Sequence, residues 1–444
     1  MALSDLHLAD LHERARELEV PRYRMLTRDE LIDAIEEAGG GDTQGETGGS
    51  SSDETGGSSR SPLASAEPTR SRSATEEQPR EGRRRERRPP LEPEEEVETE
   101  EVTGVLDRMP QGYGFLRLSG LHSAEGDVYV SASQIRRCEL RPGDEVSGPA
   151  REPRRGENHR ALVRVASVNG QEPEGERSEF EDLTPVQPHR RLLTDGAEAD
   201  PLVRAVDVLA PLALGERILV LAEPRSGRTT LLRALARAFM KGVAPRPRFG
   251  APSHPGARLL ILLVDERPEE VTEWERAMPE AEVIAAPADT EPRDQVRAAE
   301  LAIGHAKRRA EAGEDVVVVI DSLSRLALGY RDTSRVKRIF GAGRELEGED
   351  SGSLTVIATV LEDDEKGPEV RSALETTENV LIRLDAGLAA QGIVPSLRVH
   401  ETRASGEEQL RDEEEMAEAR ALRAELEQLD PAEGARVLAE RVGA

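Results

Sequence analysis

Five short apolar runs, separated by stretches with helical periodicity, dominate the chain from Pro201 to about residue 400. The runs are ILVLAEP, ARLLILLVD, EVIAAP, DVVVVIDS and SLTVIATV, beginning at Ile218, Ala257, Glu282, Asp315 and Ser353. Runs that are apolar throughout are typical of strands buried on both faces, and strands that alternate with helices form a mostly parallel sheet. The pattern predicts an α/β domain over residues 201–444, ending in a charged helical tail from Glu407 onward.

Residues 101–172 have a different pattern. Five short segments with alternating apolar and polar residues are separated by turns rich in Gly, Pro and Asp: VTGVLDRM, GYGFLRLSG, DVYVSAS, DEVSGPA and ALVRVASV. Alternation with period two predicts strands with one buried face. Five such strands at this spacing favour a small barrel of the OB-fold type, similar to a cold-shock domain. The chain is therefore expected to be multidomain.

The remaining segments connect or precede these domains. Residues 1–38 carry helical periodicity and predict a small helical N-terminal module. Residues 39–100 are Gly/Ser-rich, then Arg-rich, then acidic, and cannot bury enough apolar surface to fold. The arginines within 80–88 admit two interpretations, a weak RNA-binding arm or a solvated linker balanced by the glutamates that follow. Residues 173–200 are expected to be an acidic connector.

The net charge of −28 limits what the chain can bind. Phosphate contacts need clustered Lys and Arg, so any nucleic-acid site must be local. The N-terminal segment lacks a basic region followed by an apolar stretch, and no apolar run reaches the length of a membrane span, so neither a signal peptide nor a membrane partner is expected. The single cysteine, Cys138, excludes a disulfide framework and predicts a small buried side chain in a cytoplasmic protein.

The loop after the first apolar run has the form of a phosphate-binding loop. Strand ILVLA leads into Glu223-Pro224-Arg225-Ser226-Gly227-Arg228-Thr229-Thr230 and then into the helical run LLRALARAF. In this context loop N–H groups and the helix N-terminus bind phosphates, and the hydroxyl of Thr229 ligates Mg²⁺. The match is degenerate, since Ala222 occupies the first glycine position and Arg228 replaces the lysine.

Two carboxylates follow other strands of the same predicted sheet. Asp321 ends the run VVVVI and is a candidate for holding Mg²⁺. Glu266 lies just past LLILLVD, where it could orient the water that attacks a γ-phosphate, although a helix-capping or surface acid would also fit this position. Because carboxyl ends of parallel strands share one edge, the three features together favour nucleotide binding.

Several strings resemble the Rho family of bacterial transcription termination factors, in the family's order. They are GYGFLR (112–117), YVSASQIRR (129–137), LRPGD (140–144), FEDLTP (180–185), LVDERPEEVTE (263–273), DSLSRLA (321–327), KRIFGAGR (337–344) and GSLTVIAT (352–359). The resemblance covers roughly residues 103–410, and residues 1–38 look like the family's N-terminal helical module. It implies that residues 201–444 form a RecA-like P-loop ATPase domain.

The resemblance also implies how the barrel binds RNA. It implies a grip on single-stranded, pyrimidine-rich RNA by Tyr113, Phe115 and Arg117, with Tyr129 and Arg137 nearby. Tyr113 and Phe115 lie two apart and share one strand face, which suits base stacking, although ordinary barrel core would also explain them. The family's aromatic near the last strand appears as His159 or Arg160.

For the ATPase domain, the resemblance implies ATP and Mg²⁺ as ligands. Glu266 would be the catalytic carboxylate and Arg267 its phosphate-sensing neighbour, while Asp321 and Thr229 would hold the metal. It further implies a homohexamer with ATP at subunit interfaces, RNA in the central channel gripped by Lys366 among others, and an RNA polymerase elongation complex as partner.

The chain departs from the family where chemistry is expected. Arg228 keeps the charge of a lysine but is a planar fork. The first channel loop is reduced to the six residues between Tyr330 and Lys337, Val394 replaces an aromatic near the adenine site, and Arg403 is the nearest substitute for an arginine finger. Two functions therefore stand: an RNA-dependent ATPase that releases transcripts, or an ATPase-deficient RNA-binding paralogue that modulates termination.

Overall fold

A computed structural model describes the chain over residues 98–173, 177–192, 200–241, 256–348 and 351–443, together with Ile32. The chain divides into two compact units, Met1–Pro89 and Pro90–Ala444, and the fold described here belongs to the second. Apart from Ile32 and residues 98–100, the predicted N-terminal module and the predicted linker lie outside the described residues. No helix in the described ranges is long and apolar enough to cross a membrane.

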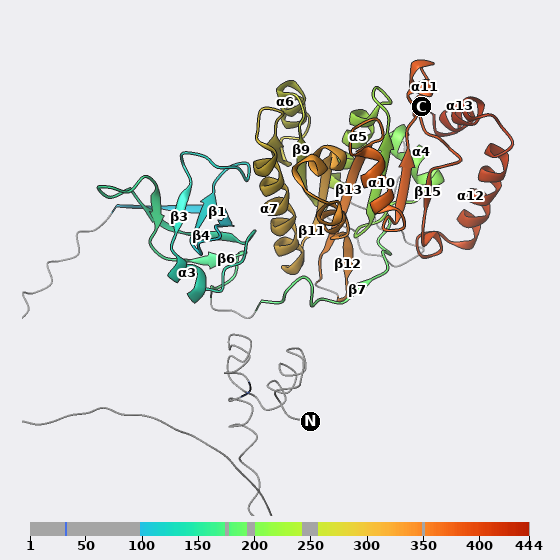
Figure 1. Ribbon diagram of the computed structural model, residues 1–444. Helices are drawn as coiled ribbons and strands as arrows, with labels where there is room; N and C mark the ends of the chain where they lie inside the picture. Colours follow the sequence, from blue (N-terminus) through green and yellow to red (C-terminus); the bar gives the residue numbers. More distant parts are fainter. Residues whose placement is uncertain are drawn as a thin grey trace, which may run out of the picture. The chain divides into compact units, whose positions relative to one another are not determined.

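The first part of this unit is a closed barrel (Figure 1). Its strands are β1 (Thr99–Arg108), β2 (Gly114–Arg117), β3 (Val128–Val130), β4 (Glu145–Arg151), β5 (Arg160–Leu162) and β6 (Ser167–Val168). They follow the order β1-β2-β3-β5-β4-β6, and antiparallel pairing of β1 with β4 closes the sheet. The OB-type barrel expected from the sequence is confirmed.

Two details of the barrel differ from the expectation. The segment DVYVSAS leaves the sheet after Val130, because Ser131 caps the short helix α3 (Ala132–Arg137) in a capping box with Gln134. The last predicted strand is divided into β5 and β6. Between them, the N–H groups of Val163 and Ala166 donate to the carbonyls of Pro149 and Ser147 of β4, outside the regular ladder. Cys138 is buried in the barrel core, as predicted.

The second part is a nine-stranded sheet with helices on both sides. Its strands are β7 (Pro185–Val186), β8 (Arg217–Ala222), β9 (Arg258–Val264), β10 (Glu282–Ala286), β11 (Asp315–Asp321), β12 (Arg344–Leu346), β13 (Ser353–Leu361), β14 (Val380–Arg383) and β15 (Arg403–Ala404). The main order is β10-β9-β11-β13-β8-β14-β15, parallel from β10 to β14. The region predicted as a connector contributes β7, which pairs with β12. The predicted α/β class is confirmed.

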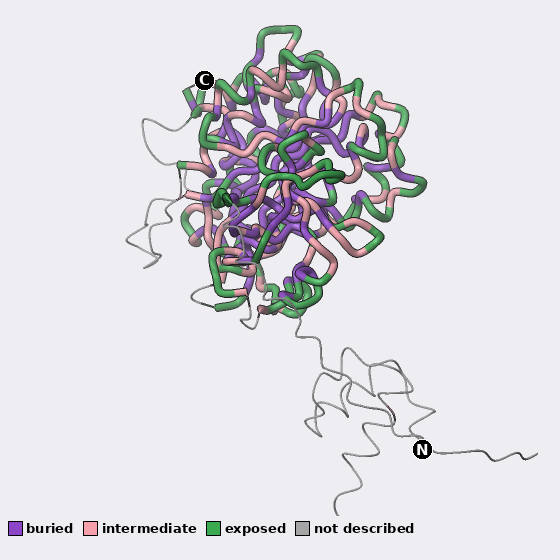
Figure 2. The backbone as a smooth tube through the Cα atoms, turned by 90° about the vertical axis from the view of Figure 1, so that its left-hand side faces the viewer, coloured by how far each residue is buried: buried purple, intermediate pink, exposed green. Residues whose placement is uncertain are grey.

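The helices cover both faces of this sheet. They are α4 (Pro201–Leu209), α5 (Arg228–Lys241), α6 (Pro268–Ala277), α7 (Pro292–Glu311), α8 (Leu323–Leu326), η3 (Ala327–Gly329), α9 (Ser334–Phe340), α10 (Gly367–Leu374), α11 (Ala386–Ala390), η4 (Glu407–Gln409), α12 (Glu413–Leu426) and α13 (Pro431–Val442). Along β11, Val317 and Val319 join one apolar core while Val316 and Val318 join the other. Figure 2 shows buried segments gathered in the interior of the described chain and exposed segments around its outside.

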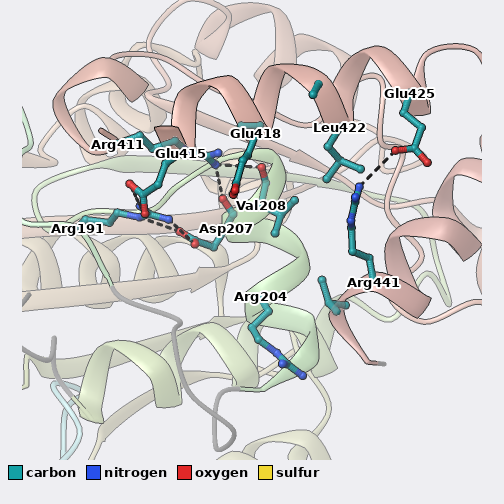
Figure 3. A pocket seen from close by; sticks show the side chains of 13 residues that line it. Arg191, Arg204, Asp207, Val208, Arg411, Glu415, Glu418, Leu422, Glu425 and Arg441 are labelled. Carbon is teal, nitrogen blue, oxygen red and sulfur yellow. Dashed lines mark hydrogen bonds and ion pairs between the residues drawn. The ribbon is translucent and has the colours of Figure 1, made fainter. Parts of the chain in front are cut away.

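The C-terminal helices are held to the domain by charged groups. Just before α12, Arg411 donates to the carbonyl of Val208 at 3.0 Å, and Arg191 Nη1 donates to Glu415 Oε1 on α12 at 3.2 Å. A polar cavity of about 720 Å³ lies between α4 and the two C-terminal helices (Figure 3). The charged tail expected from Glu407 onward is therefore part of the α/β domain.

The barrel contacts the α/β domain along helix α7. Gly143, with φ of +89°, lies so close to this helix that a Cβ there would be 2.4 Å from the carbonyl carbon of Gly304. The carbonyl of Gly143 lies 2.9 Å from His305 Nδ1, and Arg141 Nη2 donates to Glu311 at 2.7 Å. Backbone contact and ion pairs together fix the two domains along this helix.

A buried carboxyl at the start of β8 links stability to pH. Glu216 is 1% exposed and accepts a hydrogen bond from the backbone N–H of Ala213 at 2.8 Å. Burial raises the pKa of the Glu216 carboxyl to about 8. Between its ordinary pKa near 4.5 and about 8, the unfolded chain has lost a proton that the folded chain keeps, so stability falls as pH rises through this window.

We predict that Glu216→Gln removes this pH dependence, because the amide cannot ionise and its oxygen still accepts from Ala213. Relative to the wild type, the variant should gain on the order of 3 kcal/mol of unfolding free energy between pH 5 and 7. Urea unfolding followed by the fluorescence of Trp274, the single tryptophan, measures this difference. A difference that stays constant with pH would contradict the assignment.

Candidate nucleotide site and nucleic-acid interface

The loop between β8 and α5 has the geometry of a phosphate cradle. Arg225 and Gly227 adopt positive φ values of 65° and 85°, which turn the chain sharply into the helix. Ser226 is buried beneath the loop, where its hydroxyl donates to the carbonyl of Glu223 at 2.7 Å. The first N–H groups of α5, as at any helix N-terminus, have no partners within the helix and can bind an anion.

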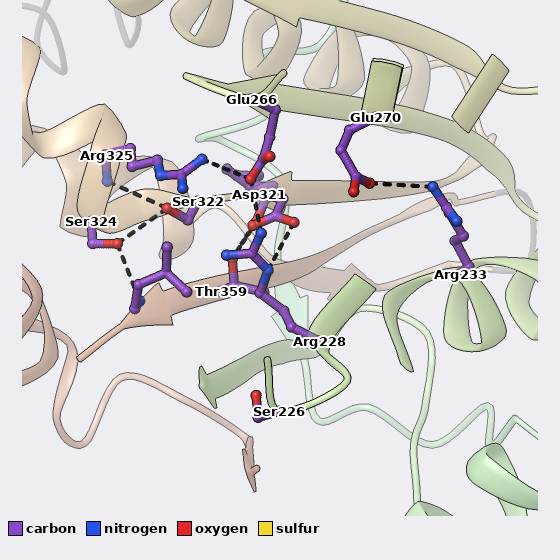
Figure 4. A network of polar contacts seen from close by, with 12 residues as sticks. Ser226, Arg228, Arg233, Glu266, Glu270, Asp321, Ser322, Ser324, Arg325 and Thr359 are labelled. Carbon is purple, nitrogen blue, oxygen red and sulfur yellow. Dashed lines mark hydrogen bonds and ion pairs between the residues drawn. The ribbon is translucent and has the colours of Figure 1, made fainter. Parts of the chain in front are cut away.

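Both predicted carboxylates lie beside this loop (Figure 4). Glu266 follows the end of β9 and Asp321 ends β11, at the shared carboxyl edge of the sheet. The guanidinium of Arg228 bridges them, with Nη2 at 2.8 Å from Glu266 Oε1 and Nε at 3.2 Å from Asp321 Oδ2. The loop arginine therefore lies between the two acids in this structure.

Arg325, on helix α8, is a further member of the cluster that the sequence analysis did not single out. Its Nη1 donates to Glu266 Oε1 and to the carbonyl of Asp265, both at 2.7 Å. The residue lies in the string DSLSRLA, four positions after Asp321, so the motif contained the only available sign of it. Its two contacts fix the direction in which the Glu266 carboxylate points.

Opposing effects act on the pKa of the Glu266 carboxyl. Burial raises the pKa of the Glu266 carboxyl and the charge of Asp321 raises it further, while Arg228 and Arg325 oppose this shift. On the other side, the hydroxyl of Thr359 donates to Asp321 Oδ1 at 2.8 Å. The site thus combines two buried acids with Arg228, which bridges them, and with Arg325, which contacts Glu266.

The other predicted nucleotide residues surround the same loop. Thr229 is half-buried in the first turn of α5, while Arg225 and Thr230 are exposed. Arg267 is exposed immediately before α6. The segment predicted near adenine also lies here, since the hydroxyl of Ser396 donates to the carbonyl of Ser226 at 2.5 Å.

These groups fit a nucleoside triphosphate with Mg²⁺. A Cβ added at Gly227 would meet nothing nearer than Ser396 Oγ at 3.8 Å, so the loop is open where phosphates would approach. The Thr229 hydroxyl and the Asp321 carboxylate are the hard oxygen ligands that Mg²⁺ prefers.

Two residues and one loop were predicted for the ring and its channel. Arg403 on β15 is exposed and 3.3 Å from Glu378. Lys366 precedes α10 and pairs with Glu369 at 2.5 Å. The shortened channel loop leads from buried Tyr330 directly into α9.

The barrel carries an aromatic cluster on its outer face. The ring centroid of Tyr113 lies 5.8 Å from that of Phe115 and 5.6 Å from that of Tyr129. All three side chains are half-buried, and the barrel core is formed by other residues, such as Leu116 and Val128. The alternative that these aromatics are ordinary barrel core does not hold. His159 occupies the place near the last strands, 4.9 Å from Phe115.

The structure places the two predicted RNA-binding arginines differently. Arg137 is exposed at the end of α3. Arg117 is buried and paired with Asp107 and Asp127, while its guanidinium carbon lies 5.6 Å from the centre of the Phe115 ring. As placed, Arg117 supports the aromatic face from one side, and its direct contact with RNA stays a prediction.

A barrel with an aromatic face, joined to an α/β domain with a phosphate loop and two strand-end carboxylates, defines the class of P-loop nucleoside triphosphatases with an oligonucleotide-binding barrel. Residues 102–174 match the family described as Rho termination factor, RNA-binding domain. Residues 203–342 match the nucleotide-binding domain of the ATP synthase alpha/beta family.

Proteins named transcription termination factor Rho are similar to this chain over most of its length. Transcription termination factor Rho of Aquifex aeolicus is 37% identical over 367 residues, covering 77% of this chain and 81% of that protein. Rho of Salmonella typhimurium is 36% identical, covering 72% and 79%. A solved ATPase of a type III secretion system is similar with a TM-score of 0.45 at 20% identity, covering 59% of this chain and 77% of that one. The chain belongs to the Rho family of transcription termination factors, and its domains fit RNA binding and ATP hydrolysis.

We predict that Arg228→Lys strengthens binding of Mg·ATP. A lysine ammonium lacks the planar fork with which the guanidinium bridges two carboxylates. In the variant, fewer contacts between residue 228 and the acids are therefore lost when Asp321 is freed for Mg·ATP. One charge-assisted hydrogen bond is worth about 1.5 kcal/mol or more, which corresponds to roughly tenfold in affinity. Titration with a fluorescent ATP analogue, with and without Mg²⁺, measures the change; unchanged or weaker binding would show that the bridge does not oppose the nucleotide.

Proposed function

We propose that this chain is a Rho-type transcription termination factor that binds nascent single-stranded RNA and uses RNA-dependent ATP hydrolysis to translocate and release the transcript. The observation that carries the proposal is the position of Glu266 and Asp321 beside the phosphate loop, both in contact with Arg228, in the same compact unit as the aromatic face of the barrel. The names and shared length of the relatives support it.

RNA would bind on the outer face of the barrel. Bases stacked on half-exposed aromatic rings gain about 1–3 kcal/mol each, and every base has a face that can stack. Tyr113, Phe115 and Tyr129 supply three such rings, with centroids 5.6 to 6.1 Å from each other. A preference for pyrimidines, as the family resemblance implies, belongs to this proposal.

ATP would bind at the phosphate loop. The N–H groups of the loop and the start of α5 would hold the phosphates, with Thr229 and Asp321 toward Mg²⁺, whose charge would stabilise the phosphate oxygens. Arg325 holds Glu266 at 2.7 Å in a fixed orientation, from which the carboxylate can align a water molecule. Arg267, exposed just before α6, would contact a phosphate.

The assembly belongs to the proposal as well. We infer a cytoplasmic homohexamer with nucleotide at the subunit interfaces, acting on an RNA polymerase elongation complex. The side chain of Arg403 is 60% exposed and makes two long contacts, with Glu378 at 3.3 Å and with the carbonyl of Glu401 at 3.4 Å, and it would give these up to reach a neighbouring subunit. Lys366 would contact RNA in the channel.

We predict that Glu266→Gln lowers RNA-stimulated ATP hydrolysis at least 100-fold and leaves RNA affinity within twofold of the wild type. The amide keeps the shape of the side chain but cannot take up a proton or hold water as a carboxylate does. Turnover is measured with and without poly(C). Glu269→Gln, at an exposed position three residues further on, is the matched control and should retain activity. If the wild type binds RNA but shows no turnover, the chain is an RNA-binding member of the family without ATPase activity.

We predict the reverse pattern for Phe115→Ala. Loss of one stacking ring should weaken RNA binding about 5- to 150-fold, as expected for 1–3 kcal/mol. Affinity for a fluorescent ATP analogue should stay unchanged, because Phe115 lies on the barrel. Fluorescence anisotropy with a labelled oligo(C) measures the first effect. Equal RNA affinity in wild type and variant would remove the aromatic face from the binding site.

A further inference from the structure

A cleft of about 740 Å³ lies between the aromatic face of the barrel and the α/β domain. Both domains contribute side chains to its lining, among them Phe115, Asp127 and His159 of the barrel and Thr290, Asp294 and Arg297 of the α/β domain. The last three come from the first turns of α7 and the residues just before it. The cleft is therefore not a property of the barrel alone.

The barrel side of the cleft has the chemistry of a nucleobase pocket. The rings of Phe115 and His159 meet edge to face at 4.9 Å. Asp127 Oδ1 and His159 Nδ1 are buried and lack a hydrogen-bond partner among the described residues. Buried polar atoms without partners are costly, so a flat ligand with polar edges is the complement of this surface.

A chain of ion pairs connects this pocket to α7. Arg297 donates to both carboxylate oxygens of Asp107, with Nη2–Oδ1 at 2.8 Å and Nε–Oδ2 at 3.0 Å. Asp107 in turn accepts from Arg117 Nε at 3.0 Å, and Arg117 pairs with Asp127. The two carboxylates and two guanidiniums alternate and balance in charge.

The burial of this chain makes Arg297 important. Asp107, Arg117 and Asp127 are only 5%, 6% and 2% exposed. Removing one partner from a buried ion-pair network leaves a charge without compensation. Without Arg297, the single guanidinium of Arg117 would face two buried carboxylates, and its hold on Asp127 and its place beside Phe115 would both be altered.

We propose that Arg297, in the α/β domain, is a positioning residue for the RNA pocket on the barrel, and that the start of α7 forms the second wall of that pocket. The inference rests on the proposed RNA-binding function. Arg297 acts through Asp107 and Arg117, and holds Asp127 and the stacking face in the geometry that accepts a base. RNA recognition thus requires both domains.

The test uses the full chain and a fluorescently labelled oligo(C) probe. Arg297→Gln should weaken RNA binding about tenfold, and Arg297→Lys should restore part of the loss. Arg293→Gln is the matched control, because Arg293 lies on the same helix with its side chain 78% exposed, and it should bind as the wild type does. Trp274 fluorescence and the thermal midpoint report whether each variant is folded.

Salt dependence separates positioning from direct contact. A lost phosphate contact lowers the slope of log affinity against log salt by about 0.7 for single strands, whereas a positioning residue leaves the slope unchanged. An unchanged slope with weaker binding supports the proposal. A slope lowered by about this amount overturns it, because Arg297 would then bind phosphate itself.

A second variant keeps the proposal open to refutation if Arg297→Gln fails to fold. Asp107→Asn breaks the same chain from the barrel side and should weaken RNA binding similarly. If the chain acts as one unit, the double variant loses no more affinity than either single variant. Affinity within twofold of the wild type in both single variants, or losses that multiply, overturns the inference. Failure of the wild type to bind oligo(C) would instead refute the proposed function.

Discussion

The packing of parallel apolar strands side by side is the constraint on which the α/β domain depends. β9, β11, β13 and β8 are buried on both faces, so their ends are the nearest points at which polar groups can appear. Parallel direction brings those ends to one edge. The phosphate loop, Glu266 and Asp321 lie together at this edge because each of them is at the carboxyl end of one of these parallel strands.

Arginine supplies most of the counter-charge inside this acidic chain. In the nucleotide site Arg228 and Arg325 hold Glu266, and at the barrel Arg117 is held between two aspartates. A planar guanidinium can serve two acids at once, which a lysine cannot do as readily. The guanidinium contacts that stabilise these clusters also hold each arginine on its acids. Function at either site therefore requires either that part of the cluster rearranges or that the other members of the cluster hold that part in place.

The sequence predicted those features that depend on local pattern. Period-two alternation predicted the barrel, and uninterrupted apolar runs predicted the parallel sheet with its strand-end acids. It did not predict α3, where a capping serine competes with strand continuation, or the role of Arg325, whose partners come from another strand. Arg117 shows the limit most clearly, since the family resemblance implies a phosphate ligand and only tertiary folding brings Asp107 and Asp127 around it.

The backbone at Ala286 connects the cleft beside the barrel with the nucleotide site. Ala286, at the end of β10, lines the cleft beside the barrel, and its carbonyl accepts a hydrogen bond of 2.8 Å from the N–H of Asp265, the residue before Glu266. Thermodynamic linkage is reciprocal. If occupation of the cleft by RNA shifts this peptide and changes nucleotide affinity by some factor, nucleotide must change RNA affinity by the same factor, so a measurement made at either site reports on the other.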